Sequence, residues 1–330
     1  MPITSDSHVE PSISAGAPSE TFTKGPLEAK PSRQELWKAA IKLPMYTVAV
    51  IPIFVGSAVA AYETAQINGL NLGLFLVGAI TIIAWLNLTN DLFDANTGID
   101  VNKAHSVVNL TGNSSLIFWI SNLFLLLGIG AIATISFLQQ DVTVLGLIFL
   151  ATFLGYTYQG PPFRFGYLGL GEPICFLTFG PLTLSAAYYS QAPTMEAFRL
   201  SNPNWLGAIF IGITTSLILF CSHFHQVEDD LAAGKASPVA RLGTQRSAYV
   251  LTAGCALAFV VMLGGAIARI LPITALLCLI SIPSAIKLCR HVLENHDQPE
   301  LVKSSKFIAV NLHFWSGLFL GLGILIGKMP

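Results

Sequence analysis

Charged side chains are scarce in this chain. Asp, Glu, Lys and Arg together make up 11% of its 330 residues, whereas hydrophobic residues make up 53%. The mean hydropathy is +0.65, and apolar stretches of about 20 residues, long enough to cross a bilayer as a helix, recur along the sequence. A soluble core cannot absorb that much apolar surface. The sequence therefore predicts an all-α, polytopic membrane protein that contacts the lipid bilayer.

Two further patterns are missing. The net charge is -1 and no block of Lys and Arg is present, which argues against nucleic acid as a partner, because proteins that bind it carry a clustered basic surface. The five cysteines lie in or beside apolar stretches without Cys-x-x-Cys spacing, so the sequence indicates neither a zinc site nor a disulfide framework. We interpret them as small hydrophobic residues.

The beginning of the chain has few large apolar side chains and is rich in Ser, Pro and Thr. This composition is typical of a disordered segment. The stretch lacks the apolar region of a signal peptide, and its acidic residues argue against an Arg-rich transit peptide. We therefore expect a disordered cytoplasmic tail at 1–36 and a membrane domain at 37–330.

Nine apolar segments follow the tail, at about 44–62, 72–90, 115–138, 143–158, 171–190, 204–222, 247–268, 271–290 and 307–327. If each spans the membrane and the N-terminus is cytoplasmic, only Arg199, Arg269 and Lys328 of the seventeen Lys and Arg residues fall on the far side. Short cytoplasmic loops carry an excess of these residues in membrane proteins. The lopsided distribution therefore supports a bundle of nine transmembrane helices with a cytoplasmic N-terminus.

Two acidic motifs follow the second and the sixth segments, so both are expected in cytoplasmic loops. The first is "NDLFDANTGID" at 90–100, and the second lies in "HFHQVEDDLAAGK" at 223–235. If the second helix continues into the first motif, three- and four-residue steps place Asn87, Asn90, Asp91 and Asp94 on one face. Similar steps relate Gln226 to Asp229 and Asp230, with Glu228 on the flank.

Carboxylates at the ends of membrane helices need an explanation. An Asp at the centre of a spanning helix costs about 2.5–3.5 kcal/mol on insertion scales, and less near the interface. Ordinary solvated loops with helix-capping aspartates are one reading. The paired motifs, short of compensating cations, instead favour Mg²⁺, which binds one or two protein carboxylates and completes its shell with water and substrate phosphates. Such an ion would join the acidic motifs to a diphosphate.

At these residues the chain resembles the UbiA-type intramembrane prenyltransferases, which use two aspartate-rich motifs and Mg²⁺. Asn90, Asp91, Asp94 and Asp100 match the first motif in the branch that prenylates 1,4-dihydroxy-2-naphthoate. "YTYQGPPFRFGYLGLGE" (156–172) and "DLAAGKASPVARLG" (230–243) resemble later motifs of that branch. The string "HQVEDDLAAGKASPVARLG", together with "HSVVNLTGN" (105–113), is most similar to the phytyltransferases of phylloquinone synthesis in oxygenic phototrophs.

The resemblance implies a reaction and a set of roles. A prenyl group, phytyl in this subgroup, is transferred from its diphosphate to dihydroxynaphthoate with loss of CO₂ and pyrophosphate. The implied catalytic residues are Asp91, Asp94 and Asp230. The implied metal ligands are Asp91, Asp94, Asp100, Gln226, Glu228, Asp229 and Asp230. Diphosphate binding is assigned to Asn90, Lys103, Lys235 and Arg241, and acceptor binding to Asn87, Tyr156, Tyr158 and Arg164.

Some positions depart from the family pattern. Gln226 stands where many relatives carry the first Asp of the second motif, and His225 stands where they often have Arg. The amide oxygen of Gln226 can ligate but brings no charge, so Glu228 or Asp229 is expected to take part. For Arg164 the reasoning is also chemical, because a guanidinium can hold the carboxylate of a planar acceptor in bidentate fashion.

Other functions remain open on the sequence alone. A transporter would place some acidic residues near the bilayer midplane, and a structural subunit would not need paired acidic motifs. Within the family, chlorophyll synthase, homogentisate prenyltransferase and menaquinone polyprenyltransferase are the alternatives. The resemblance implies the plasma or thylakoid membrane of a photosynthetic bacterium.

Overall fold

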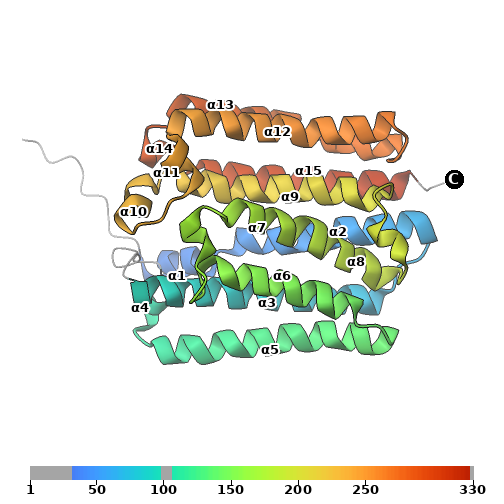
Figure 1. The fold of residues 1–330 in the computed structure, drawn as a ribbon, viewed down its shortest axis with the longest axis horizontal. Helices are drawn as coiled ribbons and strands as arrows, with labels where there is room; N and C mark the ends of the chain where they lie inside the picture. Colours follow the sequence, from blue (N-terminus) through green and yellow to red (C-terminus); the bar gives the residue numbers. More distant parts are fainter. Residues whose placement is uncertain (1–31, 98–105, 328–330) are drawn as a thin grey trace, which may run out of the picture.

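The computed structural model describes residues 32–97 and 106–327, and this part of the chain contains helices and no strand. The all-α prediction is confirmed. The longer helices are α2 (Leu43–Thr64), α3 (Gly69–Thr97), α5 (Ser114–Gln139), α6 (Thr143–Gln159), α9 (Pro203–His223), α12 (Thr244–Ile267), α13 (Ile282–Asn295) and α15 (Ser305–Ile326). They run side by side along the long axis of the molecule (Figure 1).

Shorter elements connect these helices or extend them. They are α1 (Arg33–Ile41), α4 (Val107–Thr111), η1 (Phe165–Leu168), α7 (Gly171–Leu177), η2 (Thr178–Leu182), α8 (Thr183–Gln191), η3 (Met195–Phe198), α10 (Val227–Ala232), α11 (Pro238–Leu242), η4 (Ile273–Ser281) and α14 (Pro299–Val302). Most of the predicted tail, 1–31, lies outside the described residues. Its end is helical, because Ser32 and Glu35 form a capping box that starts α1.

Seven helices in the described part of the chain are long and apolar enough to cross a membrane, and α6 is a shorter apolar helix. The prediction of a helical membrane protein is therefore confirmed at this level. The expected segment 171–190 is not one regular helix: α7 passes through the π-helical turn η2 into α8. Pro181 lies inside that turn and has no backbone N–H to donate, so the regular α-helical hydrogen bonding is interrupted there.

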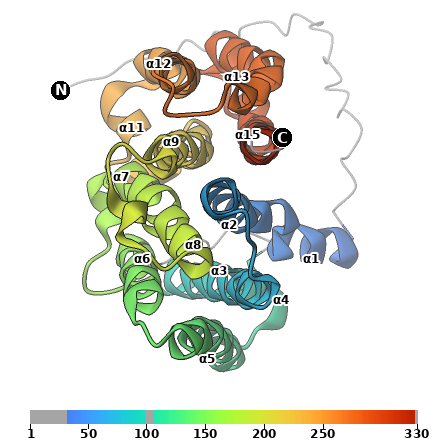
Figure 2. The same ribbon diagram turned by 90° about the vertical axis from the view of Figure 1, so that its right-hand side faces the viewer.

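Burial separates central helices from peripheral ones. In the most apolar window of α9 67% of residues are buried, against 22% in α5. Figure 2, viewed along the helix axes, shows α9 and α2 surrounded by other helices and α5 at the outer edge of the bundle. Exposed side chains such as Leu126 on α5 and Val260 on α12 are large and apolar, which suits helices that face lipid.

Glycines allow the irregular run α7–η2–α8 to approach α9 closely. A Cβ atom on Gly180 would lie 2.5 Å from the carbonyl oxygen of Ala208, and one on Gly212 would lie 2.7 Å from Cδ2 of Phe176. Small residues at such contacts let membrane helices pack backbone to backbone. These close contacts hold the run α7–η2–α8 tightly against α9.

The short helices α4, α10, α11 and α14 gather at one end of the bundle, on the left of Figure 1. The end of α3, which carries the first acidic motif, and the end of α9, which precedes the second, reach the same end. Residues far apart in the sequence are thus brought to one polar region above the apolar bundle.

Candidate active site

The first acidic motif lies on the last turns of α3. Asp91 is 2% exposed and its Oδ1 lies 2.9 Å from Nζ of Lys42, while its Oδ2 accepts a hydrogen bond from the backbone N–H of Val107 at 3.3 Å. Asp94 Oδ1 accepts a hydrogen bond from Nε2 of Gln159, the last residue of α6, at 2.8 Å. A buried carboxylate needs such partners, because an isolated charge is costly to desolvate.

Lys42 reaches Asp91 from the junction of two helices. It is both the C-cap of α1 and the N-cap of α2, with φ 54° and ψ 40°, in the left-handed region that favours glycine. The backbone turn there directs its side chain to the end of α3. The N-terminal helix pair is therefore tied to the first acidic motif by one ion pair.

The second motif centres on Asp230 in α10, which is also 2% exposed. His223 Nδ1 lies 3.1 Å from Asp230 Oδ2, and Lys235 Nζ lies 3.1 Å from Asp230 Oδ1. Burial acts to raise the pKa of this carboxyl, but the hydrogen bond with His223 and the charge of Lys235 outweigh it and hold the pKa below its ordinary value. Asp230 is thus kept ionised.

Glu172, in the first turn of α7, belongs to the same group of side chains and was not singled out from the sequence. Its Oε1 lies 3.4 Å from Nε2 of His223, and neither carboxyl oxygen makes a hydrogen bond to any described residue. The imidazole therefore stands between two carboxylates, Glu172 and Asp230. The available signal was a Glu at the start of an apolar segment, which is unusual inside a membrane protein.

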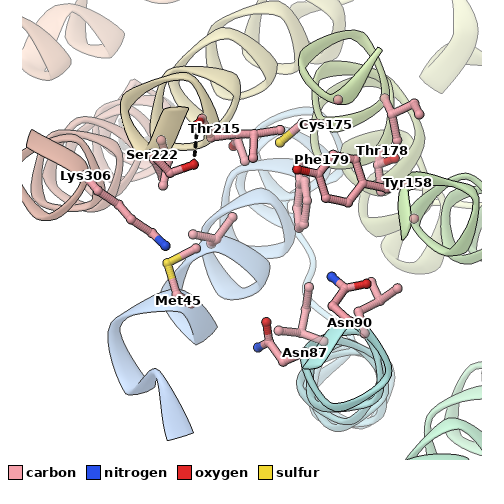
Figure 3. A pocket seen from close by; sticks show the side chains of 18 residues that line it. Met45, Asn87, Asn90, Tyr158, Cys175, Thr178, Phe179, Thr215, Ser222 and Lys306 are labelled. Atoms are coloured by element: carbon pink, nitrogen blue, oxygen red, sulfur yellow. Dashed lines mark hydrogen bonds between the residues drawn. The ribbon is translucent and has the colours of Figure 1, made fainter. Parts of the chain in front are cut away.

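A cavity of about 200 Å³ lies beside these motifs (Figure 3). Its walls come from α2, α3, α6, α7, η2, α9 and α15, and most of the lining is apolar. Polar lining groups are contributed by Asn87, Asn90, Tyr158, Thr178, Thr215, Ser222 and Lys306. A smaller cavity of about 40 Å³ shares Ile83, Leu86, Thr178 and Phe179 with it and continues into the apolar bundle.

Three of the residues expected to bind a substrate line this cavity: Asn87 and Asn90 from α3, and Tyr158 from α6. The Nδ2 atom of Asn87 is buried and has no hydrogen-bond partner among the described residues, so it can donate to a ligand. Tyr158 lies within electrostatic reach of Glu172, Asp230 and Asp94. The two acidic motifs therefore converge on the Tyr158 side of the cavity.

Tyr156, also expected to bind the acceptor, takes a different place. Its ring stacks on Trp85 with centroids 6.3 Å apart and meets Phe93 edge-on at 5.9 Å, and its hydroxyl donates to the carbonyl of Pro161 at 2.7 Å. It is absent from the cavity lining. These contacts fasten α6 and the following turn to α3.

The two predicted arginines also lie outside the lining. Arg164 is the N-cap of η1, with φ 47°, and it is absent from the cavity lining. Arg241 Nη2 donates to the carbonyl of Leu168 at 2.8 Å. Arg241 thereby ties α11 to the loop at 160–170, next to the second motif.

The remaining predicted ligands are more exposed or lie elsewhere. Gln226 is the N-cap of α10, and its carbonyl accepts a hydrogen bond from the N–H of Asp230 at 2.7 Å. Glu228 and Asp229 are exposed. Asp100 and Lys103 lie outside the described residues.

No group of three His, Cys, Asp or Glu side chains forms a metal cage within residues 32–97 and 106–327. The described carboxylates of the site come from α3, α7 and α10 instead, and their oxygens suit a hard cation. Mg²⁺ commonly takes only one or two protein carboxylates, so this donor set fits it without a preformed cage.

The sequence model of the UbiA prenyltransferase family matches residues 49–318 of this chain. The chain is 57% identical over 293 residues to 2-carboxy-1,4-naphthoquinone phytyltransferase of Synechocystis sp., covering 89% of this chain and 94% of that protein. It is 39% identical over 304 residues to the chloroplastic enzyme of the same name from Arabidopsis thaliana, covering 91% and 79%.

Two solved structures share the fold. A UbiA homolog from Aeropyrum pernix superposes with a TM-score of 0.70 at 13% identity, covering 88% of this chain and 100% of that one. A UbiA homolog from Archaeoglobus fulgidus, bound to GPP and Mg²⁺, gives a TM-score of 0.56 at 15% identity, covering 88% and 99%. At these identities the likeness concerns the fold of the helical bundle.

Proposed function

The chain belongs to the UbiA prenyltransferase family, and from this premise we propose that it transfers a phytyl group from phytyl diphosphate to 1,4-dihydroxy-2-naphthoate in phylloquinone biosynthesis, with loss of CO₂ and pyrophosphate. The observation that carries the proposal is the 57% identity to the Synechocystis phytyltransferase over 89% of the chain. The geometry supports it, because an apolar cavity ends beside two acidic motifs.

The cavities suit the two ends of a prenyl diphosphate. The apolar lining contributed by Ile83, Leu86 and Phe179 can receive the hydrocarbon tail, while the diphosphate lies toward Asn90 and the acidic motifs. The acceptor ring is proposed to lie against Tyr158, with Asn87 donating a hydrogen bond to one of its oxygens. Lys235, Lys103 and Arg241 are the proposed basic partners of the diphosphate.

Mg²⁺ is proposed as the cofactor, held by Asp91, Asp94 and Asp230, with Asp100, Gln226, Glu228 and Asp229 as further candidate ligands. When bound, the ion neutralises the charge of the departing pyrophosphate. The described residues support this by their chemistry: the buried carboxylates of Asp91 and Asp230 supply oxygen donors on two elements at one end of the bundle.

The chain contributes chiefly by positioning and by excluding water. Cleavage of the C–O bond to the diphosphate leaves an allylic cation, which the ring attacks through its carboxylate-bearing carbon. The carboxyl group then leaves as CO₂, and the electrons of its C–C bond return to the ring. The apolar walls keep water from the cation, and the polar lining orients the ring within reach of it.

The proposed membrane topology is nine spans with the N-terminus and both acidic motifs on the cytoplasmic side. In this arrangement α6 and the run α7–η2–α8 join the seven longer apolar helices as spans. The basic residues support it, because they then fall overwhelmingly on one side. The proposed location is the plasma or thylakoid membrane of a photosynthetic bacterium.

Incubation of membranes containing the protein with dihydroxynaphthoate and labelled prenyl diphosphates of different length tests the function. We expect a decarboxylated, phytylated naphthoquinol, identified by mass. Membranes with the Asp230→Asn variant serve as the control. Failure to form a prenylated product from dihydroxynaphthoate with every diphosphate would refute the proposal, and a preference for a much longer chain would reassign the enzyme to menaquinone synthesis.

A further inference from the structure

Lys306, the second residue of α15, lines the cavity and is the only charged side chain among the described residues that do so. Figure 3 shows it extending from α15 toward Met45, with Asn87 and Asn90 across the same space. The sequence explains it without any ligand, because a basic residue at the cytoplasmic end of a helix is expected from topology alone. Its position in the cavity lining also allows Lys306 to contact a ligand bound there.

Other basic side chains near the site do not line the cavity. Lys42 contacts Asp91 at 2.9 Å and Lys235 contacts Asp230 at 3.1 Å, and neither lysine is part of the lining. Arg164 and Arg241 do not contribute to the lining. A ligand inside the cavity would therefore meet the cation of Lys306, which is contributed by α15.

The rest of the lining defines what such a ligand looks like. Apolar groups from Met45, Val48 and Ile218 suit a flat hydrocarbon ring, and the unpartnered Nδ2 of Asn87 offers a hydrogen-bond donor. A cation and a neutral donor on an otherwise apolar wall match an aromatic carboxylate that also carries ring oxygens. A diphosphate has several charges and suits the ion-rich end beside Asp91 and Asp230 better.

We propose that Lys306 binds the carboxylate of the aromatic acceptor and thereby selects acceptors that carry this group. The inference rests on the proposed function and deepens it. The ion pair is present in the bound acceptor and must be given up when CO₂ leaves. Lys306 is therefore expected to lower the KM for the acceptor rather than to accelerate decarboxylation.

The test compares two acceptors, 1,4-dihydroxy-2-naphthoate and 1,4-dihydroxynaphthalene, which lacks the carboxylate, under reducing conditions. In the unaltered protein kcat/KM should favour the carboxylated acceptor. In Lys306→Met that preference should fall by at least about tenfold, chiefly through KM, because truncating one partner of a buried charge pair weakens binding strongly. The KM for phytyl diphosphate should stay unchanged.

Two variants complete the design. Lys303→Met removes an exposed lysine three residues earlier, paired with Glu300, and should keep the full preference. Lys306→Arg restores a cation and should keep most of it. If Lys306→Met fails to fold, the ratio between Lys306→Gln and Lys306→Arg gives the same comparison.

An unchanged preference in Lys306→Met overturns the inference, and so does a rise in the KM for phytyl diphosphate alone, which would assign Lys306 to the diphosphate. Failure of the proposed function looks different. In that case the unaltered protein itself forms no product from dihydroxynaphthoate with any prenyl diphosphate.

Discussion

The two ends of the helical bundle hold their carboxylates in different ways. At the end away from the short helices, Glu63 is held by the hydroxyl of Tyr188 and by Nδ2 of Asn202 at 2.8 Å, and Asp141 accepts hydrogen bonds from Tyr189 at 2.8 Å and from the N–H of Thr143 at 2.7 Å. These donors are neutral and fixed in the fold.

At the other end Asp91 and Asp230 are more deeply buried and are partnered by lysines, and a cavity lies beside them. Neutral donors that are fixed in the fold satisfy the hydrogen-bonding needs of Glu63 and Asp141, and these carboxylates are proposed to have no role in the reaction. The ion-paired carboxylates at this end lie near a cavity, where an incoming anion and a metal ion can meet them. The comparison separates acidic residues that serve the fold from those proposed to serve the reaction.

Removal of the metal should have the largest effect on activity among these tests. Chelation with EDTA should abolish product formation, because the carboxylates of the acidic end are proposed to act on the diphosphate through Mg²⁺. Added Mg²⁺ should restore turnover, and the thermal unfolding midpoint should change little. Full activity in EDTA would contradict the proposed mechanism.

Substitution of single carboxylates should separate the two ends next. Asp91→Ala, Asp94→Ala and Asp230→Ala should each lower kcat by at least about a hundredfold, as the loss of a group that stabilises transition-state charge commonly does. Asp141→Asn, at the opposite end, is the matched control and should leave kcat within about twofold, because surface and structural changes of this kind alter stability by about 1 kcal/mol. Comparable losses at both ends would show that the contrast reflects folding alone.

The basic residues should give a smaller and more selective effect. Lys235→Gln should raise the KM for phytyl diphosphate more than that for the acceptor, because Lys235 stands beside Asp230 at the proposed diphosphate end. If Arg164 holds the acceptor, Arg164→Gln should do the opposite. Since Arg164 lies outside the cavity lining, we expect its effect on the acceptor KM to be smaller than that of Lys306→Met. Steady-state kinetics with each substrate varied in turn measure both, and equal changes for the two substrates would assign these residues to the fold.

The smallest change is expected at Gln226. If its oxygen only completes a shell held by acidic neighbours, Gln226→Asp should keep activity, while Glu228→Ala or Asp229→Ala should raise the Mg²⁺ concentration needed for half-maximal turnover. Both neighbours are exposed, so their removal should leave the fold intact. Loss of activity in Gln226→Ala, with both neighbours silent, would show that the second motif is wrongly assigned.

The helical bundle could be predicted from the sequence because long apolar runs have few alternatives in a membrane. The interruption at 178–182 could not, since the apolar run continues through Pro181 and hides the change of hydrogen bonding. Tyr156 and Tyr158 illustrate the limit for single residues. They are two positions apart on α6 and face different ways. Tyr158 lines the cavity, whereas Tyr156 packs against Trp85, and this difference is visible only in the structure.

Two residues of the site were missed for a common reason. Glu172 follows a Gly-rich turn and Lys306 stands at a helix start, so each has an ordinary local explanation. Their part in the site depends on residues that are distant in the sequence. Glu172 lies beside His223 of α9, and Lys306 lines a cavity whose other walls include α2 and α3. Sequence patterns along one helix carry no information about such meetings.

At Lys42 the conformational preference of the backbone, which favours glycine, opposes the ion pair that the lysine side chain makes with Asp91. A stability engineer who replaced this left-handed residue with glycine would relieve a conformational cost of about 1–2 kcal/mol. The same change would strip Asp91, 2% exposed, of its ammonium partner, and removing the cation from a buried carboxylate is strongly destabilising. Consensus rules for turns would therefore choose the wrong residue at this position, and the strained lysine is the more stable solution.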